Sequence, residues 1–284
     1  MIRISELKYK YVPKLMDVGI ERDEAVAEFE LVVKTLSNCS GKELLLDIEI
    51  DNETEKQIIS MLEKRIATGA PIQYILGKAY FMGCEYFLNS ETLIPRPETE
   101  ILVTKVVELL NFYNKETKVL DIGTGSGCIA CAIAKNINNV EVIGVDISTT
   151  ALQAAIKNAE QLNVIKKAMF RKSDFFSNVS EKFDIIVSNP PYIPIQQKGY
   201  LQKEVQFFEP ERALFTQDEE GLEFYIKIVE EAHNYLNLEG FLVFEIGDRQ
   251  AEKVESLLVH NSFTVKDIIK DLNGIQRVIV AQID

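Results

Sequence analysis

Apolar residues in the first quarter of the chain recur at intervals of three and four, the spacing that lines one face of an α-helix. Gly19 and the polar stretch 38–41 separate the segments that show this spacing, which are 4–18, 23–36 and 53–67. We therefore predict a small N-terminal helical domain over residues 1–75.

The pattern changes after residue 78. Positions 80–87 have the pattern of a β-hairpin, and the segment 93–98 that follows is framed by Pro95 and Pro97. Proline restricts the backbone and is typical of segments between regular elements. We predict that residues 76–97 form a hairpin and connector, and that a second domain spans residues 98–284.

Beyond the connector, strand-like apolar runs alternate with amphipathic helical segments. The expected strands are 118–122, 140–145, 168–171, 183–187, 241–246, 264–269 and 276–281. One helix is expected to start at residue 126, and three further helices are expected at 149–162, 219–236 and 250–259. This alternation predicts an α/β domain with a doubly wound, mostly parallel sheet. Because only the turn 271–274 separates the last two strands, we expect them to pair antiparallel at a sheet edge.

The charge of the chain is strongly negative, while its apolar content suffices for a packed core. Lys and Arg number 31 against 44 Asp and Glu, a net charge of −13, and 46% of the 284 residues are hydrophobic. Binding to nucleic acid rests on Lys and Arg that displace counterions from phosphates, so this balance argues against a protein that mainly grips nucleic acid. It still allows a small nucleotide, which backbone N–H groups can hold.

Segments that would direct the chain to a membrane are not evident. The first ten residues lack the apolar run of a signal peptide, and the longest apolar run, Cys128–Ala134, is far shorter than the ~18 residues that suggest a membrane span. Four cysteines in so long a chain do not form a disulfide framework. We expect a cytoplasmic protein with reduced thiols and no membrane partner.

A glycine-rich turn follows the strand at 118–122 and leads directly into a helix. Its residues are Gly123, Thr124, Gly125, Ser126 and Gly127. Glycines permit a tight backbone and the start of a helix offers free N–H groups, so this turn is a candidate ligand-binding crevice. The next strand leads to Asp146, about 20 residues on, from where a carboxylate can accept both hydroxyls of a ribose. Together the turn and Asp146 indicate an adenosine-type ligand.

The spacing of the glycines separates the candidate ligands. Dinucleotide-binding turns read G-x-G-x-x-G and P-loops contain G-K-[ST], whereas this turn reads G-x-G-x-G and has no Lys or Arg. A ligand with an adenosine but no phosphates fits better. S-adenosylmethionine is the leading candidate because its cationic sulfonium also suits an acidic site, and NAD is the second.

Cys128 and Cys131 form a C-x-x-C motif in the first turns of the helix after the glycine-rich turn. Such a pair can serve redox chemistry or bind a metal, but no second cysteine pair or neighbouring histidine completes a metal site. We favour small buried side chains that pack the helix on the sheet, and we expect no metal.

The strand at 183–187 ends in the turn Asn189-Pro190-Pro191-Tyr192. Its two prolines stiffen the backbone and remove two N–H donors, which leaves the Asn189 side-chain oxygen and the Pro190 carbonyl oxygen as acceptors on a rigid frame. Two such acceptors can hold both hydrogens of a planar NH2 group, and the Tyr192 ring can stack on that group. The turn therefore favours methyl transfer to a planar nitrogen, in which positioning does most of the catalytic work.

This turn resembles that of the class I methyltransferases that modify planar amino groups, among them adenine-N6 and guanine-N2 nucleic-acid enzymes and protein glutamine methyltransferases. Over essentially the whole chain, further motifs resemble the peptide chain release factor N5-glutamine methyltransferases (PrmC/HemK family). They are Pro71–Gly77, Phe81–Gly83, Leu93–Glu100, Phe208–Pro210, Ala213–Leu214, Gly221–Leu222, Glu245–Gly247, Asp271–Gly274 and Arg277–Val278. The resemblance implies a Rossmann-like class I methyltransferase fold, with a mostly parallel seven-stranded sheet, an antiparallel C-terminal hairpin and a small N-terminal helical domain.

The resemblance also implies the activity: transfer of a methyl group from S-adenosylmethionine to the N5 side-chain amide nitrogen of the glutamine in the Gly-Gly-Gln motif of class 1 release factors. By position, Gly123–Gly127 would line the methionine and ribose of the cofactor, Asp146 would bind the ribose hydroxyls, and Asp174 and Phe175 would hold the adenine. The family often has tryptophan where this chain has Phe175, so a phenyl ring would make that contact here.

For the substrate, the resemblance implies a clamp formed by residues 189–192. Asn189, Pro190 and Tyr192 would be catalytic, Pro191 would contact the substrate, and Asn189 would also touch the cofactor. Arg96, together with its neighbours Pro97 and Glu98, either shapes the entrance and contacts the substrate or serves as a structural connector.

Two other functions stay open at this point. A DNA or RNA amino-group methyltransferase is opposed by the net charge, and the one dense basic stretch is more simply a solvated turn and strand edge: Lys166, Lys167, Arg171 and Lys172. A binding module without transferase activity is opposed by the intact turn at 189–192. We expect a monomer that docks release factors through its N-terminal domain and binds no nucleic acid.

Overall fold

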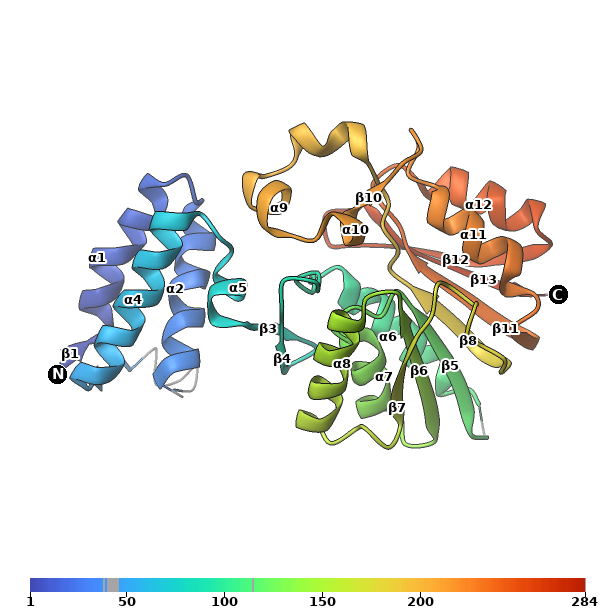
Figure 1. Cartoon of the computed structure of the whole chain (residues 1–284), viewed down its shortest axis with the longest axis horizontal. Coiled ribbons are helices and arrows are strands. Elements are labelled where there is room, and N and C mark those ends of the chain that lie inside the picture. Colours follow the sequence, from blue (N-terminus) through green and yellow to red (C-terminus); the bar gives the residue numbers. More distant parts are fainter. Residues whose placement is uncertain (38, 40–45, 114, 284) are drawn as a thin grey trace. The chain divides into compact units, whose positions relative to one another are not determined.

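The computed structural model describes residues 1–37, 39, 46–113 and 115–283 and divides into two compact units, Met1–Lys78 and Ala79–Asp284 (Figure 1). The polar break expected at 38–41 lies, apart from Cys39, outside the described residues. No helix in the described ranges is long and apolar enough to cross a membrane.

The first unit is helical, and its three longer helices occur where the hydrophobic spacing predicts them, whereas the short α5 was not predicted. Its elements are β1 (Ile2–Arg3), α1 (Ile4–Asp17), α2 (Arg22–Ser37), β2 (Glu49–Ile50), α4 (Asn52–Thr68) and α5 (Ile72–Leu76). The Asp51 carboxylate caps α4 by accepting from the N–H groups of Glu53 and Thr54. The apolar faces of the helices meet in one core, within which the Nε–H of Arg65 donates to both oxygens of the buried Glu28 carboxylate.

The second unit starts with the expected hairpin, in which β3 (Lys78–Phe81) pairs with β4 (Cys84–Phe87). Met82 and Gly83 both have positive φ, as the tight turn between the two strands requires. The hairpin packs within the second unit, where Phe81 and Tyr86 are buried in the core.

A seven-stranded sheet forms the centre of the second unit, with the strand order β12-β13-β11-β8-β5-β6-β7. The strands are β5 (Thr117–Ile122), β6 (Val140–Asp146), β7 (Ala168–Lys172), β8 (Phe183–Ser188), β11 (Leu236–Glu245), β12 (Phe263–Lys270) and β13 (Gln276–Ile283). Neighbours from β11 to β7 pair in parallel, whereas β13 pairs antiparallel with both β11 and β12. The predicted fold and the antiparallel edge are confirmed.

Helices cover both faces of this sheet (Figure 1). One face packs against α6 (Thr99–Leu110), α7 (Cys128–Asn136) and α8 (Thr149–Gln161), and the other against α11 (Glu223–Ala232) and α12 (Ala251–His260). Val119 and Leu120 of β5 accordingly belong to different cores. The sequence prediction does not include α6, nor the short elements β9 (Ile193–Pro194), η1 (Ile195–Tyr200), α9 (Lys203–Phe208), α10 (Glu211–Leu214) and β10 (Phe215–Thr216).

The helix predicted over 219–236 is shorter in the structure. The Asp218 carboxylate accepts from the N–H groups of Leu222 and Glu223, which starts α11 four residues later than expected. At the other end, Leu236 is buried and pairs with Phe183, so the chain has already entered β11.

Candidate active site

A cavity of about 400 Å³ opens at the carboxyl ends of β5, β6 and β8. The chain order reverses at β5, which lies between β6 and β8, and this is where open α/β sheets bind their ligands. Among the residues predicted from the sequence, the cavity is lined by Gly123, Gly125, Asp146, Asp174, Phe175, Asn189, Pro190 and Pro191. The glycine-rich turn, the acidic strand end and the proline turn therefore share one cavity.

The glycine-rich turn and Asp146 are joined by a hydrogen bond. Gly125, whose φ is +54°, donates its N–H to Asp146 Oδ2 at 2.9 Å, and the Ser148 N–H donates to Asp146 Oδ1 at 2.8 Å. Burial raises the pKa of Asp146, while these two N–H groups act in the opposite direction. Each carboxylate oxygen keeps a second lone pair, so both can still accept from a diol such as that of ribose.

Three predicted residues of the turn, Thr124, Ser126 and Gly127, do not line the cavity. The buried Thr124 hydroxyl donates to Asp121 Oδ2 at 2.6 Å, and the Ser126 carbonyl oxygen accepts from the Asn158 side chain. At Gly127, a Cβ atom would lie 2.8 Å from the Cβ of Ala155 on α8. Hydrogen bonds and close packing therefore hold Thr124, Ser126 and Gly127 in the turn, and their contact with a cofactor stays a prediction.

One wall of the cavity is aromatic. Phe175 lies in the loop after β7 and Phe224 at the start of α11, with ring centroids 5.8 Å apart. The Ser173 hydroxyl donates to the Phe175 carbonyl oxygen and accepts from the Asn178 N–H. These two hydrogen bonds stabilise the tight conformation of the loop after β7. Phe224 was not predicted as a site residue, because a helical pattern does not indicate which loop the helix faces.

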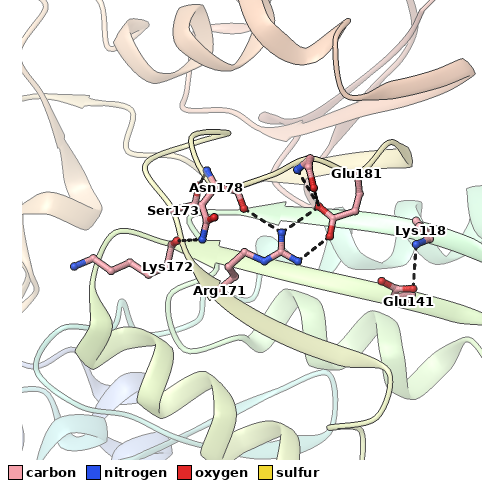
Figure 2. Close-up of polar contacts among 8 residues, drawn as sticks. Lys118, Glu141, Arg171, Lys172, Ser173, Asn178 and Glu181 are labelled. Atoms are coloured by element: carbon pink, nitrogen blue, oxygen red, sulfur yellow. Dashed lines mark hydrogen bonds and ion pairs between the residues drawn. The ribbon is translucent and has the colours of Figure 1, made fainter.

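Figure 2 shows how the same loop is anchored at its far end. Arg171 at the end of β7 donates to both carboxylate oxygens of Glu181, at 3.0 and 2.8 Å, and to the Asn178 carbonyl oxygen. Lys167, from the same basic stretch, donates to the Ile137 carbonyl oxygen. Part of this stretch therefore serves internal contacts, in agreement with its interpretation as a turn and strand edge.

We expect Glu181→Gln to lower the free energy of unfolding by about 1 kcal/mol at neutral pH and to weaken cofactor binding about threefold, because the loop that carries Phe175 loses its bidentate anchor. Hydrogen bonds from Arg171 lower the pKa of Glu181 to about 2. A lowered pKa means that the stabilisation is present above the unfolded-state value of 4.5 and is lost as the pH falls toward 2. The difference from wild type should thus shrink between about pH 5 and pH 3 in urea unfolding.

The neighbouring Glu141 on β6 provides the control; it forms an ion pair with Lys118 on the adjacent strand β5 (Figure 2). Glu141→Gln removes a similar charge without touching the loop, so cofactor affinity should stay at the wild-type value. Equal cofactor affinities for Glu181→Gln and wild type would contradict the anchoring role.

The turn after β8 presents two free acceptors at the cavity. The Asn189 side-chain N–H2 donates to Thr99 Oγ1 at 3.2 Å. Among the described residues, no donor is bonded to the Asn189 amide oxygen or to the Pro190 carbonyl oxygen. Both atoms are thus available to a ligand, as the sequence analysis requires of a clamp for an NH2 group.

Tyr192 and Arg96 do not line this cavity. The Tyr192 carbonyl oxygen accepts from the Gln250 side chain, and its ring lies so close to Gly247 that a Cβ atom there would be 2.9 Å from Cδ2. Arg96 forms an ion pair with the buried carboxylate of Glu209. This pair gives Arg96 a structural partner and ties the proline segment to the segment after α9, which supports the connector alternative.

The rim of the cavity contains an ion pair that the sequence analysis missed. Arg212 at α10 and Glu91 after the hairpin both line the cavity and approach each other to 3.4 Å. They are 121 residues apart in the chain, since 212 − 91 = 121. No local pattern could have indicated their proximity.

Cys128 and Cys131 are buried in the core between α7 and the sheet. Burial raises the pKa of the Cys128 thiol to about 12, and it raises the pKa of Cys131 as well. Both thiols therefore stay protonated at neutral pH, and the packing interpretation of the C-x-x-C motif is supported.

Comparisons with known proteins agree with this arrangement. Residues 97–269 match the methyltransferase small domain family, and residues 11–77 match the PrmC N-terminal domain. In a solved structure, the ribosomal protein L11 methylase of Lactobacillus delbrueckii subsp. bulgaricus, the same fold aligns with a TM-score of 0.50 and 25% identity, covering 67% of this chain and 80% of that chain.

Relatives that are similar over most of the chain identify the family more closely. The release factor glutamine methyltransferase of Thermodesulfovibrio yellowstonii is 41% identical over 236 residues, which cover 82% of this chain and 84% of the relative. That of Flavobacterium psychrophilum is 36% identical over 288 residues, which cover 97% and 98%. The chain therefore belongs to the release factor glutamine methyltransferase family, whose catalytic domain has the class I fold and uses S-adenosylmethionine.

Proposed function

We propose that this chain methylates the side-chain N5 of the glutamine in the Gly-Gly-Gln motif of class 1 peptide chain release factors. The observation that carries the proposal is the pair of free acceptors, Asn189 Oδ1 and the Pro190 carbonyl oxygen, at the edge of a cavity with an acidic ribose-binding position. A primary amide has two hydrogens in one plane, and two acceptors on a rigid turn match them.

The residues at the cavity fit S-adenosylmethionine. Asp146 offers both oxygens to the ribose hydroxyls, and Gly123 and Gly125 leave room for the methionine portion because they have no side chains. Asp174 and Phe175 are assigned to the adenine, with Phe224 on the same wall. The glycine-rich turn contributes no Lys or Arg, so it fits the phosphate-free S-adenosylmethionine better than NAD.

When bound, S-adenosylmethionine supplies a methyl group on a cationic sulfur that is a good leaving group. The task of the protein is then to hold the amide nitrogen in line with that group. By accepting both amide hydrogens, Asn189 and Pro190 orient the nitrogen and oppose delocalisation of its lone pair into the carbonyl. No strong base is required, because one amide proton can pass to solvent water late, once the bond from nitrogen to the methyl carbon has formed. Positioning is the main catalytic contribution.

Tyr192 is assigned as the wall on which the substrate amide stacks. It follows the clamp directly, and its charged neighbours are Glu245, Arg277, Arg96 and Glu98. A position outside the cofactor cavity is what a wall on the substrate side requires. Arg96 is assigned to positioning the segment around Glu209 rather than to a direct substrate contact.

A protein substrate fits the charge of the chain better than a nucleic acid does. The net charge is −13, and Arg171 of the only dense basic stretch is engaged by Glu181. Translation termination takes place in the cytoplasm, which is therefore the compartment that this substrate implies.

The deciding experiment is mass spectrometry of a class 1 release factor after incubation with the enzyme and S-adenosylmethionine. We expect a gain of about 14 Da, one methylene, on the glutamine of Gly-Gly-Gln. A release factor whose Gly-Gly-Gln glutamine is replaced by alanine should stay unmodified. Labelled cofactor incubated with DNA or RNA in parallel tests the alternative, and label only on nucleic acid would overturn the proposal.

We assign docking of the release factor to the N-terminal unit. On α1, Tyr9 is 87% exposed and Met16, seven residues and two helical turns later, is 41% exposed on the same side. We expect the double variant Tyr9→Ser/Met16→Ser to raise the KM for the release factor about tenfold and to leave kcat unchanged. Leu238→Ser, at an equally exposed residue of the second unit, is the control. An unchanged KM would contradict docking by this face of α1.

A further inference from the structure

Two buried side chains, Thr99 and Glu245, adjoin the proposed clamp without lining the cofactor cavity. Glu245 ends β11, and the register that pairs Phe244 with Ser188 on β8 brings it level with Asn189. Thr99 starts α6. Three segments that are far apart in the sequence thus meet behind the Asn189 side chain.

Two hydrogen bonds connect these residues, and both are donated in the direction from Asn189 toward Glu245. Asn189 Nδ2 donates to Thr99 Oγ1 at 3.2 Å, and Thr99 Oγ1 donates to Glu245 Oε2 at 2.6 Å. A carboxylate can only accept, so the single hydroxyl hydrogen of Thr99 goes to Glu245. The Thr99 oxygen can then only accept from Asn189. This orders the amide with its N–H2 toward Thr99 and its oxygen on the other side.

The orientation of this amide matters for the proposed reaction. The substrate amide offers two hydrogens, and only the oxygen of Asn189 can accept one. A flipped Asn189 would direct its own N–H2 at the substrate N–H2, donor against donor. We propose that Thr99 and Glu245 are positioning residues that keep the Asn189 oxygen facing the substrate amide; this inference rests on the proposed function.

The surroundings of Thr99 and Glu245 favour a strong hydrogen-bond relay, by which we mean the chain of bonds from Asn189 through Thr99 to Glu245. Thr99 is 3% and Glu245 2% exposed, so water does not compete for their hydrogen bonds. The titratable groups that face Glu245 come from several elements and from the loops before α6 and after β8: Arg277 on β13, Glu98 before α6, Tyr192 after β8, Cys128 on α7 and Tyr225 on α11, whose hydroxyl donates to the Glu245 carbonyl oxygen. Among them, Arg277 favours the ionised carboxylate and Glu98 opposes it.

Protonation of Glu245 would reverse the relay. Burial raises the pKa of Glu245 to about 7, while the hydrogen bond from Thr99 acts in the opposite direction. A protonated Glu245 can donate to Thr99, whose hydroxyl hydrogen is then free to turn to the Asn189 oxygen. Methyl transfer should therefore weaken as the pH falls below about 7, through Glu245 rather than through the substrate, whose amide does not titrate there.

The first test compares Thr99→Val with Thr99→Ser in the full-length enzyme, with a release factor and S-adenosylmethionine as substrates. Valine has the shape of threonine but no hydroxyl, so we expect kcat to fall about tenfold or more while the dissociation constant for the cofactor stays within about twofold. Serine restores the hydroxyl and should return kcat to within about threefold of wild type. Equal kcat values for Thr99→Val and wild type would overturn the relay.

The second test is the pH profile of Glu245→Gln, which decides the question even if Thr99→Val does not fold. Wild type should lose activity as the pH drops through about 7, and the variant should show no such loss in that range. An equal loss of activity below about pH 7 in both enzymes would overturn the proposal. If the wild-type enzyme methylates no release factor, the proposed function is wrong. If the wild type is active and both substitutions leave its activity unchanged, only the positioning role of Thr99 and Glu245 is wrong.

Discussion

Asn189→Ala should reduce the rate of methyl transfer to a release factor by a factor of about 100 to 1,000, the cost of removing one preorganised hydrogen-bonding group from a reacting centre. The variant loses the acceptor that orients the substrate amide, while Pro190 and the cavity remain. Its dissociation constant for S-adenosylmethionine should stay within about threefold of wild type, since Asp146 and Phe175 are untouched. Transfer of labelled methyl at saturating cofactor measures the first quantity, and calorimetry measures the second.

A matched control is Asn136→Ala, the same substitution at an exposed asparagine near the end of α7. It should leave both quantities at their wild-type values. If Asn189→Ala turned over at the wild-type rate, the clamp would have to be assigned to other residues. A variant that had also lost the cofactor would show that Asn189 supports the cavity rather than the substrate.

Asp146→Ala should raise the dissociation constant for S-adenosylmethionine about 100-fold. Two hydrogen bonds to a charged group are lost, each contributing about 1.5 kcal/mol, and a tenfold change in affinity corresponds to about 1.4 kcal/mol. The substitution also leaves the N–H groups of Gly125 and Ser148 without their acceptor, which loosens the glycine-rich turn. Asp146→Asn keeps the size of the side chain and one acceptor oxygen, so the loss should be about tenfold.

Titration calorimetry of both variants tests this assignment, with Asp267→Ala as the control. Asp267 forms an ion pair with Lys105 at the edge of the sheet, and it does not line the cavity. Its removal should leave cofactor affinity unchanged. A cofactor affinity for Asp146→Ala equal to that of wild type would show that the ribose is held elsewhere.

Much of the fold and of the cofactor site could be predicted from the sequence because the signals are local. The strand before Gly123, the glycines themselves and Asp146 at the end of the next strand lie within 30 residues, from Thr117 to Asp146. Asn189 and Pro190 likewise follow directly on an apolar strand. Parallel strands bring their carboxyl ends to one edge, so these separate local signals converge without any knowledge of distant contacts.

Other parts of the site depend on contacts between distant segments. Phe224 faces Phe175 only because α11 packs on the sheet beside the loop after β7. Thr124, Ser126 and Gly127 look like ligand contacts in the sequence. In the structure the Thr124 hydroxyl donates to Asp121, the Ser126 carbonyl oxygen accepts from Asn158, and Gly127 packs closely against Ala155.

Local patterns in the sequence were enough to predict the strands of the large sheet, most of the longer helices, the ligand class of the glycine-rich turn and the acceptor pair at Asn189 and Pro190, since each depends on neighbours in the chain. The direction in which the Asn189 amide faces, by contrast, depends on contacts between distant segments. That choice depends on the Thr99 hydroxyl, which arrives with a helix the sequence pattern did not reveal, and on the Glu245 carboxylate, which strand pairing brings level with Asn189. Hydrogen-bond direction is a property of the assembled group and cannot be read from any one segment.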